Sequence, residues 1–388
     1  MRLGVISSAV AAALATPSVL AFEVYNDDVN SLTIGGYADI RAVNTQDTTE
    51  IIDGTSRINF DFVRQMGNGW STQAKMEWGV NLVGNTDLSL TGDYVHTRTD
   101  EFLNNRLGFI GAHHDTYGSF TAGKQWGVYY DIAHNTDIPH VWAGTSSGVY
   151  TFNGDGGLNG TGRADKAFQY RNEFGNFKLG LQVQARNASD EIDDLQGNPP
   201  PVPLANDPNQ IRSISYDNTF GISARYQVMD ELELGIAYNH GKFEGAFVDG
   251  RALSETDKIT GVSATWGGMY DEGLYVGFNA NQAEYHEVDN AGRIMPKSTG
   301  AEAVVSYAMD NGFVPLVMMN YLKADDEAYG NLYNGESFER SFVTAGFHYL
   351  WSDKTILYIE ARKDFSDVPT AQAMVEDDGI GIGMRFYM

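Results

Sequence analysis

The last ten residues of the chain, positions 379–388, read GIGIGMRFYM, and every second one is apolar. The apolar positions are Ile380, Ile382, Met384, Phe386 and Met388. Glycines, Arg385 and Tyr387 occupy the positions between them. A period of two predicts a β-strand, because successive side chains of a strand point to opposite faces of its sheet. This strand therefore has one apolar face and one face that carries an arginine.

The same alternation recurs along the chain. In residues 31–41, Ile34 and Ile40 share one face, whereas Asp39 and Arg41 share the other. Five more segments repeat the pattern: 56–63, 70–80, 178–186, 232–238 and 354–363. The composition, with 43 glycines and 12% aromatic residues, also suits many strands joined by turns. We therefore predict an all-β fold.

The connections between these segments alternate between short and long. Seven short turns lie at QMGNGW, HDTYGS, EFGNF, VMDEL, MYDEGL, MDNGF and WSDKT. Eight longer polar segments lie near 44–54, 81–103, 128–165, 187–210, 245–256, 288–297, 324–337 and 366–377. Together they join sixteen strands, and short turns on one rim with long loops on the other are typical of bacterial outer-membrane barrels. A closed barrel pairs all its backbone groups, so it can cross a bilayer without a helix.

A barrel of sixteen strands encloses too much space for side chains to fill. The polar face of each strand is therefore expected to line water, and the apolar face to meet lipid. A soluble sandwich also alternates, but its apolar face points inward and its core has no use for an arginine. Aromatic residues near the short turns are expected to form an interfacial girdle. They are Phe62, Trp70, Phe174, Phe177, Tyr270, Phe313 and Trp351.

The N-terminus has the pattern of a secretory signal peptide over residues 1–21. Arg2 precedes the apolar run LGVISSAVAAALA, and the small-residue site VLA ends at Ala21. The rest, 22–388, is predicted to be a single barrel. The net charge is −25, which excludes nucleic acid as a partner, and the absence of cysteine excludes disulfides.

Several segments resemble one known family, the trimeric general porins of Gram-negative outer membranes. They are NRLGFIGAHHDTYGSFTAGKQWGVYYDI (105–132), FQYRN (168–172) and the C-terminal GIGMRFYM. The resemblance covers essentially the whole chain after the signal segment. It implies a transmembrane, antiparallel up-and-down β-barrel with short periplasmic turns and long extracellular loops, assembled as a homotrimer in lipid and lipopolysaccharide. One departure is that family members usually end on phenylalanine, whereas this chain ends on Met388.

The resemblance also implies where the pore narrows. In the family the third loop, here 128–165, folds into the barrel and faces a ladder of basic residues on the wall. Arg41, Arg57, Arg106 and Arg171 match that ladder by motif or by strand parity. On the loop side of the constriction we place Asp137, His140 and Trp142, and His140 lies near the position of a family acidic residue. Phe386, Tyr387 and Met388 match the closing strand and assembly signal.

The expected function is passive diffusion of small hydrophilic solutes and ions through a water-filled pore, with a weak cation preference from the acidic loops. A channel specific for chito- or malto-oligosaccharides is the alternative, with Tyr37, Trp142, Tyr150 and Phe152 as candidate stacking rings. An enzyme built in a barrel is a third reading. The sequence offers it no nucleophile motif, only a weak histidine pair at His113 and His114. We expect no enzyme activity, cofactor or metal.

Overall fold

The computed structural model describes residues 22–45, 48–84, 86, 102–152, 154–189, 207–372 and 378–388. The expected signal peptide, 1–21, lies outside the described residues. No helix in the described ranges is long and apolar enough to cross a membrane.

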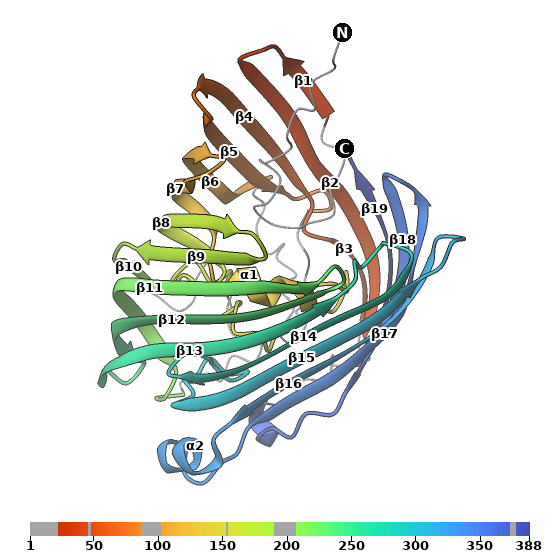
Figure 1. Cartoon of the computed structure of the whole chain (residues 1–388). Helices are drawn as coiled ribbons and strands as arrows, with labels where there is room; N and C mark the ends of the chain where they lie inside the picture. The colour runs from red at the N-terminus through yellow and green to blue at the C-terminus, as the bar shows by residue number, and fades with distance from the viewer. Residues whose placement is uncertain are drawn as a thin grey trace.

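Sixteen antiparallel strands of the described chain form one closed barrel (Figure 1), which confirms the predicted fold class. The ring closes where β19 pairs with β2, from Gly379 opposite Thr45 to Tyr387 opposite Tyr37. The strands are β2 (Asn30–Thr45), β4 (Arg57–Gly67), β5 (Trp70–Val80), β6 (Leu103–His114), β7 (Gly118–Trp126), β8 (Arg163–Phe174), β9 (Phe177–Gln184), β11 (Ile211–Met229), β12 (Leu232–Phe247), β13 (Ala252–Trp266), β14 (Gly273–Glu284), β15 (Lys297–Ala308), β16 (Phe313–Ala324), β17 (Glu339–Ser352), β18 (Thr355–Asp364) and β19 (Gly379–Tyr387).

Shorter elements decorate this ring. The strands β1 (Phe22–Asn26) and β3 (Thr49–Asp53) pair with β2, and β10 (Asn187–Ser189) pairs with β11. The helices are α1 (Tyr130–Ala133), η2 (His134–Thr136), α2 (Asp326–Leu332) and η4 (Thr370–Gln372).

The seven short turns and eight longer connections lie between the strands where the sequence predicts them, but two of the expected loops are shorter. The segment 44–54 is mostly strand, because β2 extends to Thr45 and β3 pairs with it. The segment expected as a loop at 245–256 is mostly strand, because β12 and β13 stay paired from Gly245 opposite Leu253 to Ala246 opposite Ala252. Continued pairing satisfies backbone groups that a loop would leave to water.

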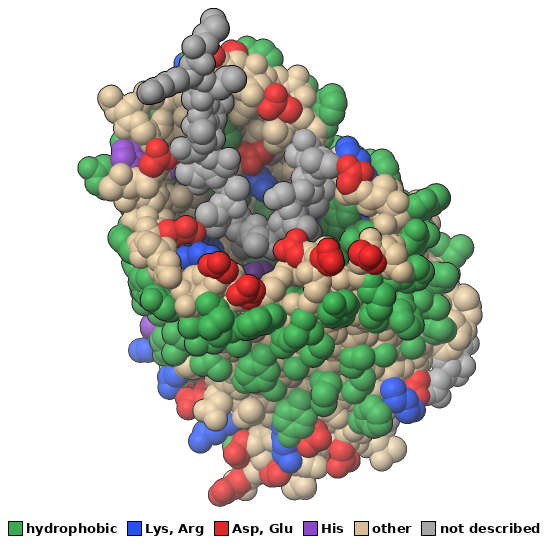
Figure 2. Space-filling model, turned by 45° about the vertical axis from the view of Figure 1, so that its right-hand side comes forward, with side chains coloured by type: hydrophobic (Ala, Val, Ile, Leu, Met, Phe, Trp, Pro, Cys, Tyr) green, Lys and Arg blue, Asp and Glu red, His purple; other side chains and the backbone are tan. Residues whose placement is uncertain are grey.

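The two faces of the wall differ as predicted. On the closing strand Ile380, Ile382, Met384 and Phe386 are exposed on the outside, whereas Tyr387 is buried. Figure 2 shows a band of hydrophobic side chains across the face of the outer wall that it presents, with charged side chains above and below this band. Most of the expected girdle is exposed outward, as at Phe174 and Trp351. Tyr270 was placed wrongly in the girdle: its hydroxyl lies 2.9 Å from His348 Nδ1, inside the barrel, because proximity to a turn does not fix which way a ring points.

Candidate functional site

The connection between β7 and β8, residues 127–162, lies inside the ring of strands. It begins at Gly127, whose N–H bonds to the carbonyl oxygen of Gly162 and so brings the two ends of the loop together. The chain then forms α1 and η2, and Val128, Tyr129 and Ile132 are buried against the wall. α1 contacts β11, β12 and β13 (Figure 1).

Glycines on the inner wall make room for this loop. A Cβ built on Gly277 of β14 would stand 2.1 Å from the carbonyl oxygen of Asn135, and one on Gly300 of β15 would stand 2.1 Å from that of Ser146. No real side chain tolerates such distances, so at these two positions the loop backbone can approach the wall backbone this closely only because the wall has glycine. We call these positions the glycine belt: Gly180, Gly221, Gly235, Gly261, Gly277, Gly300, Gly379 and Gly381, each of whose added Cβ would meet a loop atom.

Two buried wall carboxylates hold the loop by its backbone. Glu360 of β18 accepts N–H bonds from His140 at 2.6 Å, Val141 at 2.8 Å and Trp142 at 3.3 Å. Glu302 of β15 accepts the N–H of Ser146 at 2.6 Å. The second oxygen of Glu302 accepts the hydroxyl of Thr136 and the amide of Asn279. Hydrogen bonds to a charged acceptor are about twice as strong as neutral ones, so these two residues are the main polar anchors of the loop.

Arg57 and Arg106 lie together on the inner wall and share one carboxylate. Glu77 Oε1 is 2.9 Å from Arg106 Nε and 3.9 Å from an Arg57 nitrogen. The Arg57 guanidinium also lies over the ring of Tyr37, 4.5 Å from its centroid. Two guanidiniums facing one carboxylate leave this patch of wall positive.

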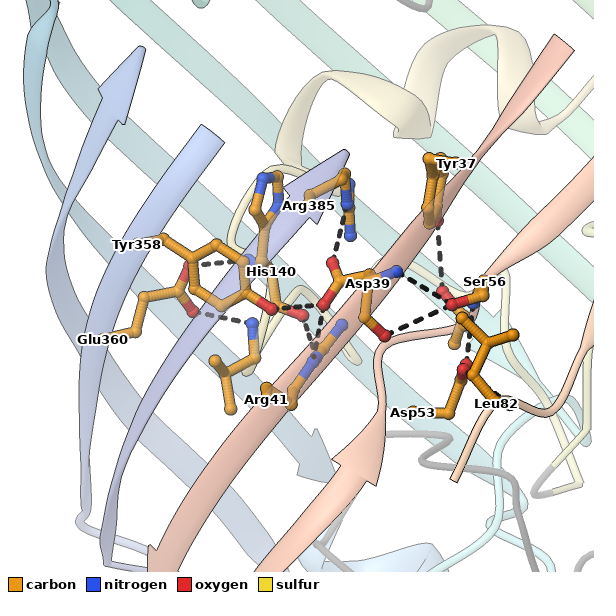
Figure 3. A network of polar contacts seen from close by, with 12 residues as sticks. Tyr37, Asp39, Arg41, Asp53, Ser56, Leu82, His140, Tyr358, Glu360 and Arg385 are labelled. Carbon is orange, nitrogen blue, oxygen red and sulfur yellow. Dashed lines mark hydrogen bonds and ion pairs between the residues drawn. The ribbon is translucent and has the colours of Figure 1, made fainter. Parts of the chain in front are cut away.

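Arg41 and Arg385 share a second carboxylate, Asp39, which is fully buried (Figure 3). Arg385 Nε is 2.7 Å from Asp39 Oδ2, and Arg41 Nε is 3.5 Å from Asp39 Oδ1. Arg41 donates to the carbonyl oxygen of His140, so it touches the loop directly. The prediction omitted Arg385. Its place on the polar face of the closing strand was the signal that could have found it.

Arg171 bonds to the loop. Its guanidinium donates to both oxygens of Asp131 in α1, each at 3.1 Å, and to the carbonyl oxygen of Trp126 at 3.0 Å. Asp131 therefore pairs with Arg171, although the prediction omitted it. The segment 105–132 contains this aspartate, and its position directly after Tyr130 at the start of the loop was the signal that could have found it.

On the loop side, Asp137 accepts the hydroxyls of Tyr130 at 2.9 Å and Tyr150 at 2.8 Å. Burial first, and the Asp137 charge second, hold the pKa of both tyrosines well above the usual range. The charge of Arg57 opposes this shift in the pKa of Tyr130, and the charges of Arg163 and Arg106 oppose it in that of Tyr150. The loop tyrosines and Asp137 therefore lie in the field of the wall arginines.

His140 and Trp142 lie against the wall. The His140 ring stacks on His348 at 4.4 Å between centroids, and burial, followed by the charge of Arg385, keeps the pKa of His140 well below its usual value. Trp142 is buried with Val43, Phe342 and Tyr358. The tryptophan therefore anchors the loop and offers no open ring to a solute.

The chain end completes the barrel. The Tyr387 ring packs edge-on against Tyr37 at 5.6 Å, and the Tyr387 N–H bonds to the carbonyl oxygen of Lys354. The N–H of Met388 bonds to the carbonyl oxygen of Gly36 at 3.1 Å. Phe386 points outward.

Within the described residues, no group of three or more His, Cys, Asp or Glu side chains could hold a metal ion. His113 and His114 point to different partners: His113 lies against Ser119 and Gln73, whereas His114 packs on Trp70.

The comparisons with known proteins agree on one family. The model of the Gram-negative porin family matches residues 7–367. Outer membrane protein S2 of Salmonella typhi is 27% identical over the whole of both chains, and outer membrane porin C of Serratia marcescens is 26% identical over the same extent. Among solved structures, Salmonella typhi OmpF in complex with daunomycin superposes with a TM-score of 0.70 at 19% identity, covering 95% of this chain and all of that one. OmpT of Vibrio cholerae, in a trimer form, gives 0.63 at 15% identity, covering 93% of this chain and all of that one.

Proposed function

The chain belongs to the Gram-negative porin family, and we propose that it lets small hydrophilic solutes and ions diffuse passively through a water-filled pore inside its barrel. It is a protein of the outer membrane, and its relatives are porins, which are channels rather than enzymes. Residues 1–21 would be its export signal. Outer-membrane lipid and lipopolysaccharide would contact the outer wall.

One arrangement carries this proposal: wall arginines on one side of the lumen and a loop edge of tyrosines and a carboxylate on the other. Arg57 and Arg106 act electrostatically on Tyr130 and Tyr150, which both bond to Asp137. A transverse field of this kind orders water and dipolar solutes, and an apolar molecule gains nothing from it. The β7–β8 loop is thus the proposed constriction, and Arg41 and Arg171 hold it in place.

A weak cation preference follows from the balance of charge. The wall arginines of the site face buried carboxylates: Asp39 lies beside Arg41 and Arg385, and Glu77 beside Arg57 and Arg106. These two carboxylates offset half of the charge of the four arginines. The field of the whole chain, with net charge −25, opposes the positive remainder and sets the sign at the pore. Cations are then concentrated at the pore, although only modestly at physiological salt.

The test is the reversal potential of the reconstituted protein in a salt gradient across a planar bilayer. Replacing Arg57 and Arg106 together by glutamine removes two positive charges and leaves Glu77 unpaired. We expect cation preference to increase. Arg64→Gln is the matched control, because Arg64 lies on the same strand as Arg57 but its side chain is exposed and bonds to Asn30. Unchanged selectivity and conductance in the double variant would contradict the proposed constriction.

A channel specific for oligosaccharides remains the second candidate, and one observation favours it. The half-buried rings of Trp126 and Tyr130 stack at 3.9 Å between centroids inside the barrel, a surface on which a sugar ring could pack. Phe152 and Trp142 are buried and do not extend this surface. Saturable block of single-channel current by a malto- or chito-oligosaccharide would support this candidate, and a current that sugars leave unchanged would support the general pore.

We also propose that the protein is a homotrimer. The outer faces of β6 and β7 expose Ile110 and Phe120 and carry little bulk at Gly108, beside which an added Cβ would meet no atom within 4 Å. Small residues allow packed walls to approach closely. Unheated semi-native electrophoresis should show a trimer band, and a monomer band alone would contradict the assembly. We assign the closing strand, with Phe386, Tyr387 and Met388, as the assembly signal.

A further inference from the structure

A second connection, between β14 and β15, is also buried. Every residue from His286 to Met295 is buried, although this loop joins strands at the rim. It forms a small hairpin: Val288 pairs with Ile294, and the N–H of Met295 bonds to the carbonyl oxygen of Glu287 at 2.8 Å. A rim loop in water would expose its tip, so this hairpin must bend back over the molecule.

The hairpin reaches strands on both sides of its own. On one side the amide of Gln210, next to β11, donates to the carbonyl oxygen of Ala291 at 2.6 Å. On the other side Arg340 of β17 donates to the Asn290 side chain at 3.5 Å. The strands β11 and β17 are six places apart in the ring, which is about 29 Å along the wall at the usual strand spacing. The hairpin therefore crosses a sector of the lumen.

The distal half of the β7–β8 loop lies against this hairpin. His286 Nε2 bonds to the carbonyl oxygen of Gly148 at 2.8 Å, and His286 Nδ1 bonds to Asp257 of β13 at 2.6 Å. Apolar contact extends the interface, because Phe152 and Leu158 of the loop share a cluster with Val288 and Ile294. The loop is thus held between the wall and the hairpin.

Other rim loops hold the hairpin down. Arg293 is buried and bonds to Asp289 at 2.7 Å, to Glu336 at 2.8 Å and to the Tyr329 hydroxyl at 2.6 Å. Glu336 and Tyr329 belong to the β16–β17 connection, whose Tyr333 also donates to the carbonyl oxygen of Ile294 at 2.7 Å. A buried guanidinium is stable only with such partners, so Arg293 fixes the hairpin in its inward position.

We propose that the β14–β15 hairpin is a second pore-narrowing element, which fills the sector between β11 and β17 and braces the constriction loop there. The open path is then confined to the opposite sector, whose wall carries Arg57 on β4 and Arg106 on β6. This inference rests on the proposed pore function and adds which part of the barrel conducts. His286 and Arg293 act as positioning residues.

The decisive experiment shortens the hairpin. Residues 288–294 are replaced by a two-glycine turn, which can join Glu287 to Met295 because these residues already pair. Single-channel conductance and the largest neutral sugar admitted by proteoliposomes are then measured. Both should increase. A shortened protein that shows the heat-modifiable mobility of a folded barrel but keeps the wild-type conductance and size limit would overturn the proposal.

If the shortened chain fails to fold, the Arg293→Gln variant tests whether the hairpin braces the loop. We expect larger open-channel current fluctuations and a higher mean conductance, because the hairpin loses its clamp while its length is unchanged. Arg251→Gln is the control: Arg251 pairs with Asp249 at 2.6 Å in the exposed β12–β13 turn and should be silent. Arg293→Gln currents identical to those of Arg251→Gln would reject the brace. Wild-type protein without any conductance would instead reject the pore function itself.

Discussion

Replacing Gly277 by alanine should push the β7–β8 loop, which we propose as the constriction, toward the lumen. The added Cβ would stand 2.1 Å from the carbonyl oxygen of Asn135, whereas ordinary van der Waals contact begins at 3.4 Å, so the two must separate by about 1.3 Å. Gly277 is paired to Thr265 on one side and Val304 on the other, which fixes the strand. The loop is the part that can yield, and it can move only toward the lumen.

The contacts of Asn135 oppose this displacement of the loop. Its side-chain amide donates to Ala264, Thr265 and Phe278 at 2.9–3.1 Å, and its carbonyl oxygen accepts the Tyr275 hydroxyl at 2.6 Å. Overpacking of a well-packed site usually costs about 1–3 kcal/mol. The barrel should therefore still fold, with a slightly lower temperature of heat modification.

Single-channel conductance in planar bilayers is the assay. The Gly277→Ala channel should conduct less than wild type and exclude smaller sugars. Gly330→Ala in α2 is the matched control, because a Cβ there would meet nothing closer than 3.4 Å, an ordinary contact distance. A folded Gly277→Ala barrel with the conductance of the control would refute the contact between the glycine belt and the loop.

Three further predictions concern the polar anchors. Glu360→Gln keeps one carbonyl acceptor but loses the charge that holds three N–H groups of the loop. A hydrogen bond to a charged group contributes about 1.5–3 kcal/mol, so the loop should be held less firmly. Single-channel recordings should then show more frequent current fluctuations. Asp39→Asn leaves Arg41 and Arg385 without their shared carboxylate, and urea denaturation should show a loss of about 3–5 kcal/mol. Burial alone would lower the pKa of His286, but the Asp257 carboxylate raises it to about 9. This shift from the usual 6.5 stabilises the folded state by about 3 kcal/mol. The stabilisation is complete below pH 6.5 and is lost as pH rises through 9. Urea midpoints between pH 7 and pH 10 should fall more in wild type than in His286→Asn, and parallel curves would contradict the linkage.

The barrel could be predicted from the sequence because the alternation of apolar and polar residues that defines each strand is visible locally. Each strand shows its two faces within about ten residues, as residues 379–388 do, and the turns set the count of strands. Where the sequence showed no such alternation, the prediction was wrong. Tyr270 lies near a turn but points inward, and the segment 245–256 is polar yet pairs as strand.

The site was less predictable, because its contacts join distant parts of the chain. The inward direction of Arg57, Arg106 and Arg171 could be predicted from motif and strand parity. In contrast, Glu302 and Glu360 meet the loop 156 and 220 residues away in the sequence. A single glutamate on a polar strand face carries no mark of such a partner. The inward course of the β14–β15 hairpin was equally hidden, since its residues read as an ordinary polar loop.

The closure between β2 and β19 sets the order in which the molecule can be made. Asp39 and Arg385, which meet across this seam at 2.7 Å, are 346 positions apart. The cylinder therefore cannot be completed until β19 has been synthesised and has reached the membrane. Until then two strand edges are open to pairing with other chains, which is a hazard for aggregation. An exported chain of this design depends on being kept unfolded in transit, and loss of even its last strand would leave a curled sheet in place of a tube.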